Sequence, residues 1–310
     1  MNATVTAEGC SYRCRRCLAR VEASRRPTSC RWCSQVNTYA LATDSDPAAR
    51  SLPGPTAFFQ KRKRKQESID ASGGCGETSS LDKVESAGEV RFEVGIGALD
   101  RLFGGGAVCG ASYMLSGQPG AGKSTLLLQL LASVSKIYGE NVFYATAEEQ
   151  PKMIRDRGDR LKIPTKVQRK IKVSATDDID YVCKEILRLR PVVVVLDSVQ
   201  KFRDTGLPGM AGAGLQPGRV LDLFQQALIS VQSFGLVISQ ENKRKEMAGA
   251  LALQHHVDAT FRMSVVAKSA YREITASKNR YGSADVVARL QMTETGLIES
   301  TLREDDSPDF

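Results

Sequence analysis

Histidine and long apolar runs are nearly absent from this sequence. The 310 residues contain two histidines, His255 and His256, and these are adjacent. Sites that need separated histidines, such as zinc hydrolase centres with two or three histidine ligands, are therefore excluded. No run of 18 apolar residues exists, and the N-terminal residues lack the apolar segment of a secretory signal. We therefore expect no membrane span, no export and a cytoplasmic location.

Basic charge is concentrated near one end of the chain. Residues 1–65 contain thirteen Lys and Arg against four Asp and Glu, a net charge of +9, whereas the remaining 245 residues have a net charge of −1. A basic module attracts phosphate backbones without reading their sequence. A solvated tail that aids solubility would have the same composition, so charge favours a nucleic-acid partner without excluding that alternative.

Three regions differ in composition. Residues 10–40 are rich in Cys and Arg and predict a small folded module. Residues 41–90 contain a Pro-Gly-Pro sequence, a run of five basic residues and a Ser/Gly stretch, which indicates a flexible basic linker. In residues 91–310, short apolar runs alternate with helical patterns, which is typical of an α/β domain with a mostly parallel sheet.

The periodicity predicts the elements of this domain. We expect strands at residues 113–116, 141–146, 172–174, 192–196 and 235–239, and helices at residues 123–138, 151–160, 179–190 and 219–232. The fourth strand is continuously apolar, as in the buried centre of a parallel sheet. A terminal set of antiparallel strands is expected at residues 259–265, 271–278 and 286–292.

The strongest motif lies between the first predicted strand and the first predicted helix. It fits the pattern G-x-x-x-x-G-K-[ST] of a phosphate-binding loop and consists of Gly117, Gln118, Pro119, Gly120, Ala121, Gly122, Lys123 and Ser124, followed by Thr125. The glycines let backbone N–H groups face the phosphates, and the helix N-terminus adds partial positive charge. Lys123 supplies a point charge, and the Ser124 hydroxyl is suited to Mg²⁺. The motif predicts a site for ATP with Mg²⁺.

Acidic and amide side chains follow the neighbouring strands. Asp197 ends the continuously apolar strand, and we expect it to hold Mg²⁺ directly or through Ser124 and water. Glu148 and Glu149 follow the second predicted strand; we favour Glu148 as the carboxylate that polarises the attacking water, with Glu149 as its helper. Gln240 follows the last parallel strand and is an amide suited to sensing the γ-phosphate.

Four cysteines have the spacing of a zinc site. Cys14-x₂-Cys17 and Cys30-x₂-Cys33 are separated by twelve residues, and each pair can chelate from one turn. Four thiolates form a closed shell, so the expected Zn²⁺ is structural and stabilises a segment too small to fold alone. Thiols in such pairs, rather than scattered along the chain, also indicate a reducing compartment.

These motifs together resemble those of the bacterial RadA/Sms family of DNA-repair proteins. The resemblance covers about residues 10–300, apart from the linker. It rests on the cysteine pairs, the glycine-rich segment at residues 95–106, the phosphate loop, Thr146-Ala147-Glu148-Glu149, and Lys278-Asn279-Arg280-Tyr281-Gly282. The last is close to the family's Lys-Asn-Arg-Phe-Gly motif, with Tyr in place of Phe. The family's usual Lon-protease-like C-terminal domain is missing from the sequence, which leaves the oligomeric state open.

The resemblance implies a RecA-like P-loop ATPase core and a DNA-stimulated ATPase. Family members form hexameric rings around single-stranded DNA and extend strand exchange by branch migration during recombination and repair. For this chain the resemblance implies a nucleoid-associated homo-oligomer that binds single-stranded and branched DNA and works with recombinase or replication proteins. In that picture Lys278 and Arg280 would reach across a subunit interface to the neighbour's ATP.

The same resemblance suggests DNA-binding loops after two strands, at residues 201–218 and 242–249. The candidate contacts are Lys201, Arg203, Arg219, Lys243, Arg244 and Lys245. Loops rich in glycine can order on DNA and couple that ordering to the nucleotide. Three functions stay open: a DNA motor with helicase-like translocation, an ATP-gated single-strand-binding mediator, and a signalling ATPase with a protein partner. The basic cysteine module disfavours the third.

Overall fold

The chain divides into two compact units, residues 1–92 and 93–310. The computed structural model describes residues 80, 89–240 and 253–299, and the backbone of three strands nearer the N-terminus. These three strands form a small antiparallel sheet in the order β2-β1-β3: β1 (Cys10–Cys14), β2 (Arg20–Ala23) and β3 (Tyr39–Leu41). The predicted zinc site and the predicted linker lie outside the residues whose side chains are described.

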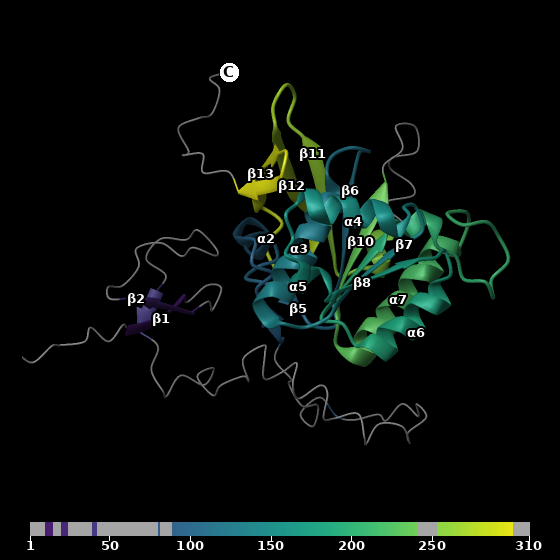
Figure 1. Ribbon diagram of the computed structural model, residues 1–310. Helices are drawn as coiled ribbons and strands as arrows, with labels where there is room; N and C mark the ends of the chain where they lie inside the picture. The colour runs from purple at the N-terminus through teal and green to yellow at the C-terminus, as the bar shows by residue number, and fades with distance from the viewer. Residues whose placement is uncertain are drawn as a thin grey trace, which may run out of the picture. The chain divides into compact units, whose positions relative to one another are not determined.

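The second unit is built on a nine-stranded sheet (Figure 1). Its order is β14-β13-β12-β11-β6-β10-β9-β7-β8. Six neighbouring strands, from β11 to β8, run parallel, and β12, β13 and β14 continue the sheet as an antiparallel set. The strands are β6 (Ser112–Gly117), β7 (Val142–Thr146), β8 (Ile171–Ala175), β9 (Val193–Asp197), β10 (Phe234–Gln240), β11 (Ala259–Val265), β12 (Tyr271–Asn279), β13 (Val287–Thr293) and β14 (Gly296–Glu299).

Helices cover both faces of this sheet (Figure 1). α6 and α7 pack beside each other on one face, and α2 and α3 cover the other. Two further short strands are β4 (Arg91–Phe92) and β5 (Ala107–Val108). The helices are α2 (Gly97–Leu102), α3 (Lys123–Tyr138), α4 (Pro151–Arg160), α5 (Thr165–Gln168), α6 (Ile179–Leu189) and α7 (Gln216–Val231), with the short 3₁₀ helices η3 (Val199–Lys201) and η4 (Gln254–His256).

Local sequence explains several of these boundaries. α3 begins at Lys123, ends at Tyr138 and is capped by Gly139, whose φ of 66° is the left-handed conformation that glycine adopts at helix ends. α6 begins after Asp178, whose carboxylate accepts hydrogen bonds from the backbone N–H groups of Asp180 and Tyr181. All five residues of β9 are buried, as its continuous apolar sequence requires between two helical layers.

The predicted elements are found with small shifts at their ends. The helix predicted at residues 219–232 begins three residues earlier, because Pro217 occupies its first turn, where a missing N–H costs nothing. The strand predicted at residues 172–174 extends by one residue at each end. α2, α5 and β14 were not predicted, since each is six residues or shorter and has too few positions to show a period.

No helix among the described residues is long and apolar enough to cross a membrane. The predicted division into a cysteine module, a linker and an ATPase domain stays a prediction in its boundaries.

Candidate nucleotide-binding site

The predicted phosphate loop connects the carboxyl end of β6 to the first turn of α3. Gly117 has a φ of 148°, and a Cβ there would lie 2.3 Å from the backbone oxygen of Met263, so no larger residue fits. The buried Lys123 donates from Nζ to the carbonyl oxygens of Gly117 (2.6 Å) and Gln118 (3.0 Å). The loop therefore curls around the ammonium group that the sequence assigns to phosphate binding.

A second basic residue touches the same loop. Arg272, at the start of β12, donates from Nε to the carbonyl oxygen of Ala121 at 3.0 Å. The sequence does not indicate this contact, because Arg272 is 151 positions from Ala121 and only the pairing of β11 with both β6 and β12 brings them together. Arg272 holds the loop from the antiparallel side of the sheet.

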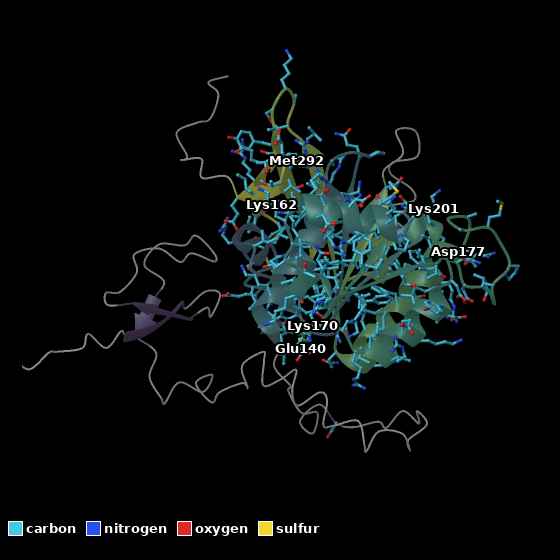
Figure 2. The ribbon with its side chains drawn as sticks, viewed as in Figure 1. Glu140, Lys162, Lys170, Asp177, Lys201 and Met292 are labelled. Carbon is cyan, nitrogen blue, oxygen red and sulfur yellow. The ribbon has the colours of Figure 1, made fainter. Side chains whose placement is uncertain are left out.

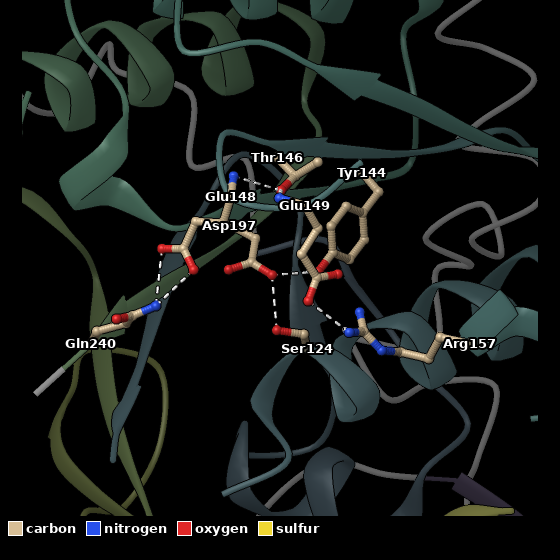
Figure 3. Close-up of polar contacts among 8 residues, drawn as sticks. All are labelled: Ser124, Tyr144, Thr146, Glu148, Glu149, Arg157, Asp197 and Gln240. Atoms are coloured by element: carbon tan, nitrogen blue, oxygen red, sulfur yellow. Dashed lines mark hydrogen bonds and ion pairs between the residues drawn. The ribbon is translucent and has the colours of Figure 1, made fainter. Parts of the chain in front are cut away.

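Asp197 and Ser124, the two residues predicted to hold Mg²⁺, are in contact (Figure 3). The Ser124 hydroxyl donates to Asp197 Oδ2 at 2.8 Å, and the Tyr144 hydroxyl donates to the same oxygen at 2.5 Å. Burial raises the pKa of the Asp197 carboxyl, although the hydrogen bonds from Tyr144 and Ser124 act in the opposite direction. Burial, and then the Asp197 charge, raises the pKa of Tyr144 well above its usual value, so its hydroxyl stays a donor.

The Ser124 hydroxyl and the Asp197 carboxylate meet at the start of α3. Both provide oxygen ligands, which Mg²⁺ prefers, and Mg²⁺ usually takes only one or two ligands from the protein. The residues present therefore fit the ion that the motif implies. Tyr144 was not predicted as part of this group. Tyr144 lies two residues before Thr146 on β7, so both side chains lie on one face of the strand. This spacing could have indicated from the sequence that Tyr144 belongs to the group.

Glu148 lies in a turn at the carboxyl end of β7. The Thr146 hydroxyl oxygen accepts hydrogen bonds from the backbone N–H groups of Glu148 and Glu149, both at 3.1 Å. The Gln240 amide donates to both carboxylate oxygens of Glu148, at 2.9 and 2.7 Å, and the Ser198 hydroxyl donates to one of them. Two side chains from the ends of other strands thus hold Glu148, as Figure 3 shows for Gln240.

Glu149 has a different environment from Glu148. Its Oε1 accepts a hydrogen bond from Nη2 of Arg157 on α4 at 2.7 Å, and the two side chains are 22% and 16% exposed. Glu149 Oε2 and Arg157 Nη1 are buried and have no hydrogen-bond partner within the described part of the chain. Glu149 is therefore committed to an internal ion pair beside Asp197, a surrounding that the sequence did not indicate (Figure 3).

Lys278 and Arg280 lie toward the amino ends of the parallel strands, away from the phosphate loop. Through β11, Lys278 is level with Met114 on β6, three residues and about 10 Å along the strand from Gly117. Lys278 Nζ donates to the carbonyl oxygens of Gln254 and Val257, both at 2.6 Å. Burial, and then the charge of Arg280, lowers the pKa of the Lys278 ammonium group.

Asp258 joins Arg280 to the sheet. Its Oδ1 lies 3.0 Å from Arg280 Nη1, and its Oδ2 accepts a hydrogen bond from the backbone N–H of Ser112 at 3.0 Å. A cavity of about 670 Å³ opens beside this pair, and Arg280 and Asp258 are among its lining residues. Neither Lys278 nor Arg280 can serve the phosphate loop of its own chain from this end of the sheet.

The six candidate DNA contacts are only partly described. Lys201 is exposed after β9, at the carboxyl end of the sheet (Figure 2). Arg203 pairs with Asp177 at 2.9 Å and Arg219 pairs with Asp204 at 3.0 Å, so both guanidinium groups already have carboxylate partners. Lys243, Arg244 and Lys245 lie outside the described residues. The roles given to these six residues stay predictions.

Comparison with known proteins shows which proteins this chain resembles. A family profile described as "ATPase: KaiC" matches residues 92–177. The chain is 30% identical over 234 residues to the DNA repair protein RadA of Haemophilus influenzae, covering 74% of this chain and 50% of the relative. It is 28% identical over 287 residues to the DNA repair protein RadA of Mycobacterium tuberculosis, covering 92% of this chain and 55% of the relative. The chain thus spans about half the length of these curated relatives.

A solved structure agrees on the fold. The crystal structure of the RadB recombinase superposes with a TM-score of 0.53 at 20% identity, covering 67% of this chain and 99% of that chain. The predicted RecA-like core with a mostly parallel sheet is confirmed. The motifs that suggested the RadA/Sms family also agree with the relatives found. The chain has the RecA-like fold and is similar to the DNA repair protein RadA over about half of that protein's length.

Proposed function

We propose that this chain hydrolyses ATP with Mg²⁺ in response to single-stranded DNA, as part of recombination and DNA repair. The single observation that carries the proposal is the convergence of Lys123, the Ser124–Asp197 pair and Glu148 at the carboxyl ends of adjacent parallel strands. This is the edge at which open α/β sheets bind nucleotides. The names of the curated relatives support the repair context.

In the proposed reaction, the loop N–H groups and Lys123 bind the β- and γ-phosphates. Ser124 and Asp197 would hold Mg²⁺, which would neutralise part of the phosphate charge when bound. A water oxygen forms a bond to the γ-phosphorus while the bond to the β-bridging oxygen breaks, which releases ADP and phosphate. Glu148 orients that water and accepts its proton. Glu149, paired with Arg157, stabilises the arrangement rather than taking the proton.

Gln240 offers a route from DNA to this chemistry. It holds both oxygens of Glu148 and is the last described residue before the segment 241–252, which contains Lys243, Arg244 and Lys245. We propose that DNA bound to that segment moves Gln240 away from Glu148 and frees the carboxylate for water. Hydrolysis would then be slow without DNA and faster with it.

The proposal is tested by measuring phosphate release against the concentration of a single-stranded oligonucleotide. DNA should raise the rate, and Gln240→Ala should raise the DNA-free rate and reduce the stimulation. Gln200→Ala is the matched control, because Gln200 bonds Ser239 and the Gln240 backbone but does not touch Glu148. Absence of ATP binding, or a rate indifferent to DNA in every variant, would reject the proposal.

The remaining predictions are finer. We propose a homo-oligomer, ring-shaped as in the family, in which Lys278 and Arg280 contact the ATP of the neighbouring subunit. Strand displacement on a forked substrate separates a motor with branch-migration activity from an ATP-gated mediator: DNA-stimulated hydrolysis without displacement favours the mediator. The Zn²⁺ site, the partner recombinase or replication proteins and the location at the nucleoid stay predictions.

A further inference from the structure

The antiparallel strands touch the second half of the phosphate loop. Arg272 of β12 donates a hydrogen bond to the carbonyl oxygen of Ala121. A Cβ atom on Gly122 would lie 2.5 Å from Cε of Met292 on β13, which Figure 2 labels, and 3.5 Å from Cδ1 of Leu297 on β14. Each of the three strands therefore contributes one side chain that supports this part of the loop. The motif itself does not indicate this support, because the three side chains come from distant parts of the sequence.

Strand pairing explains how Arg272 reaches the loop. Met263 of β11 is level both with Gly117, the last residue of β6, and with Ile274 of β12. Arg272 lies two residues beyond Ile274, so it is past the end of β6 and beside the loop. Side chains two residues apart share a face of a strand, and Ile274 is buried beside residues of α2 and α3. Arg272 therefore lies on the sheet face that α3 covers, where the loop leads into this helix.

The bond from Arg272 determines which way one peptide group faces. Nε of Arg272 lies 3.0 Å from the carbonyl oxygen of Ala121, a fully buried residue. In a planar trans peptide, the carbonyl of one residue and the N–H of the next point in opposite directions. Because the Ala121 carbonyl points at β12, the Gly122 N–H points away from the strands that support the loop. This N–H has no hydrogen-bond partner within the described part of the chain, so it is available to a bound phosphate.

The residues on either side of Ala121 would otherwise let this peptide group turn over. Gly120 and Gly122 have φ values of 77° and 104°, in a region that glycine enters without steric cost. If the peptide group turned over, the Ala121 carbonyl oxygen would face the ligand in place of the Gly122 N–H. A carbonyl oxygen carries partial negative charge and repels a phosphate, whereas an N–H group attracts it. The bond from Arg272 stabilises the orientation that attracts phosphate.

The charge of Arg272 is a second property that must be separated from its hydrogen bond. Its Nη1 donates to the carbonyl oxygen of Tyr271 at 3.0 Å. Among the residues that the structure describes, no carboxylate forms an ion pair with this guanidinium, whereas Arg280 and Arg289 each face one. An uncompensated charge beside the loop would attract phosphate even without the bond to Ala121. Substitutions that remove one property and keep the other distinguish the two contributions.

We propose that Arg272 is a positioning residue for nucleotide binding: its Nε–H group holds the peptide between Ala121 and Gly122 so that the Gly122 N–H faces the phosphates. This inference rests on the proposed function, since it requires that the loop binds a nucleoside di- or triphosphate. A hydrogen bond from the loop to a phosphate is made in the bound substrate as well as in the transition state. Loss of the positioning bond therefore weakens nucleotide binding more than it slows hydrolysis of bound ATP.

Three substitutions separate the hydrogen bond from the charge. In Arg272→Gln, the amide nitrogen occupies the same place along the side chain as Nε of arginine, so an N–H donor remains and the charge is removed. Arg272→Lys keeps a charge but has a methylene group in place of Nε–H, and Arg272→Met keeps neither property. If the bond positions the loop, Arg272→Gln resembles the unmodified chain, and Arg272→Lys resembles Arg272→Met.

The first experiment titrates the full chain with ADP and Mg²⁺ in a calorimeter, without DNA. Arg272→Met and Arg272→Lys should each raise the dissociation constant of ADP by about tenfold, and Arg272→Gln should regain most of the affinity. Arg289→Met is the matched control, because Arg289 lies on the neighbouring strand, pairs with Glu273 and is 60% exposed. This control should leave the dissociation constant close to that of the unmodified chain.

The second experiment measures steady-state hydrolysis by the same variants. The KM for ATP should rise by about tenfold in Arg272→Lys and Arg272→Met, while kcat changes by less than about threefold. Thermal unfolding without nucleotide checks that each variant is folded. A lower melting temperature with unchanged ADP affinity would limit Arg272 to a structural role and overturn the proposal.

Two other results would also overturn it. One is equal ADP affinity in all Arg272 variants and the unmodified chain. The other is a larger loss in Arg272→Gln than in Arg272→Lys, which would assign the effect to charge rather than to the bond with Ala121. An unmodified chain that binds no ADP would instead reject the proposed function, and the inference with it, so the two failures are distinguishable.

Discussion

The two ends of the nine-stranded sheet are built on different principles. At the carboxyl end, polar side chains bond one another across strands, and Glu149 Oε2 and Arg157 Nη1 are buried with no hydrogen-bond partner within the described residues. At the amino end, Lys278 donates to two carbonyl oxygens and Arg280 faces Asp258. At the carboxyl end, a bound ligand could therefore replace some of these side-chain hydrogen bonds. The amino end instead holds its cations in fixed positions, where a second molecule can meet them.

The largest expected effect tests the carboxyl end. Lys123→Ala should lower the rate of ATP hydrolysis by about a thousandfold, because the ammonium group that offsets phosphate charge in the transition state is lost. Phosphate release measures the effect, and the melting temperature should stay close to that of the unmodified chain. Retained turnover would show that the assignment of the phosphate loop is wrong.

The next prediction separates the two adjacent carboxylates. Glu148→Gln should keep ATP binding but lower hydrolysis by about a hundredfold or more, because the proton acceptor is lost. Glu149→Gln should mainly lower the free energy of unfolding, by about 2–3 kcal/mol, because the largely buried Arg157 loses its charge partner. Nucleotide-binding titrations, phosphate release and chemical denaturation distinguish the two losses. The reverse pattern would exchange the roles of Glu148 and Glu149.

The amino end is tested by mixing subunits. Arg280→Ala should lower hydrolysis by about a hundredfold if its guanidinium serves the neighbouring ATP. In mixtures with the unmodified chain, activity should fall faster than the fraction of altered subunits rises, and Lys278→Ala should behave in the same way. Arg289→Ala is a control, since Arg289 contacts Glu273 on the exposed antiparallel part of the sheet. Activity that falls in direct proportion to the altered fraction would limit Lys278 and Arg280 to structural roles.

The smallest expected effect concerns Asp100 in α2. Burial raises the pKa of this carboxyl to about 7, even though the N–H groups of Val94 and Gly95 donate to it. The folded state therefore favours the protonated form. The stability this contributes is complete below about pH 4 and is lost as pH rises through 7. When the pH is lowered from 8 to 5.5, the free energy of unfolding of the unmodified chain should rise by about 2 kcal/mol relative to that of Asp100→Asn. Denaturation at the two pH values checks this, and a pH-independent difference would contradict it.

Sequence alone predicted the features that depend on neighbouring residues. The phosphate loop, the apolar strand that ends at Asp197 and the helix at residues 123–138 are each specified by a short continuous pattern. For the same reason the sequence placed Ser124 and Asp197 at one edge of a parallel sheet, where they are found 2.8 Å apart.

The rest depends on pairings between distant residues. Arg272 reaches the phosphate loop only because β11 pairs with both β6 and β12, and Lys278 finds its carbonyl partners more than twenty positions away. Glu149 was expected to help Glu148, but its partner is Arg157, eight residues further along the chain and on α4. No periodicity in the sequence signals that the guanidinium of Arg157 turns inward.

Asp258 has a mechanical consequence. One of its oxygens faces Arg280, and the other holds the first residue of β6, the strand whose last residue opens the phosphate loop. β6 is six residues and about 20 Å long, and it is hydrogen-bonded to a strand on each side, so it links Ser112 rigidly to Gly117. A force applied to Arg280 by an adjacent molecule would therefore displace β6 as a rigid unit. In the proposed oligomer, this strand would couple the nucleotide sites of successive copies without a relay of moving side chains.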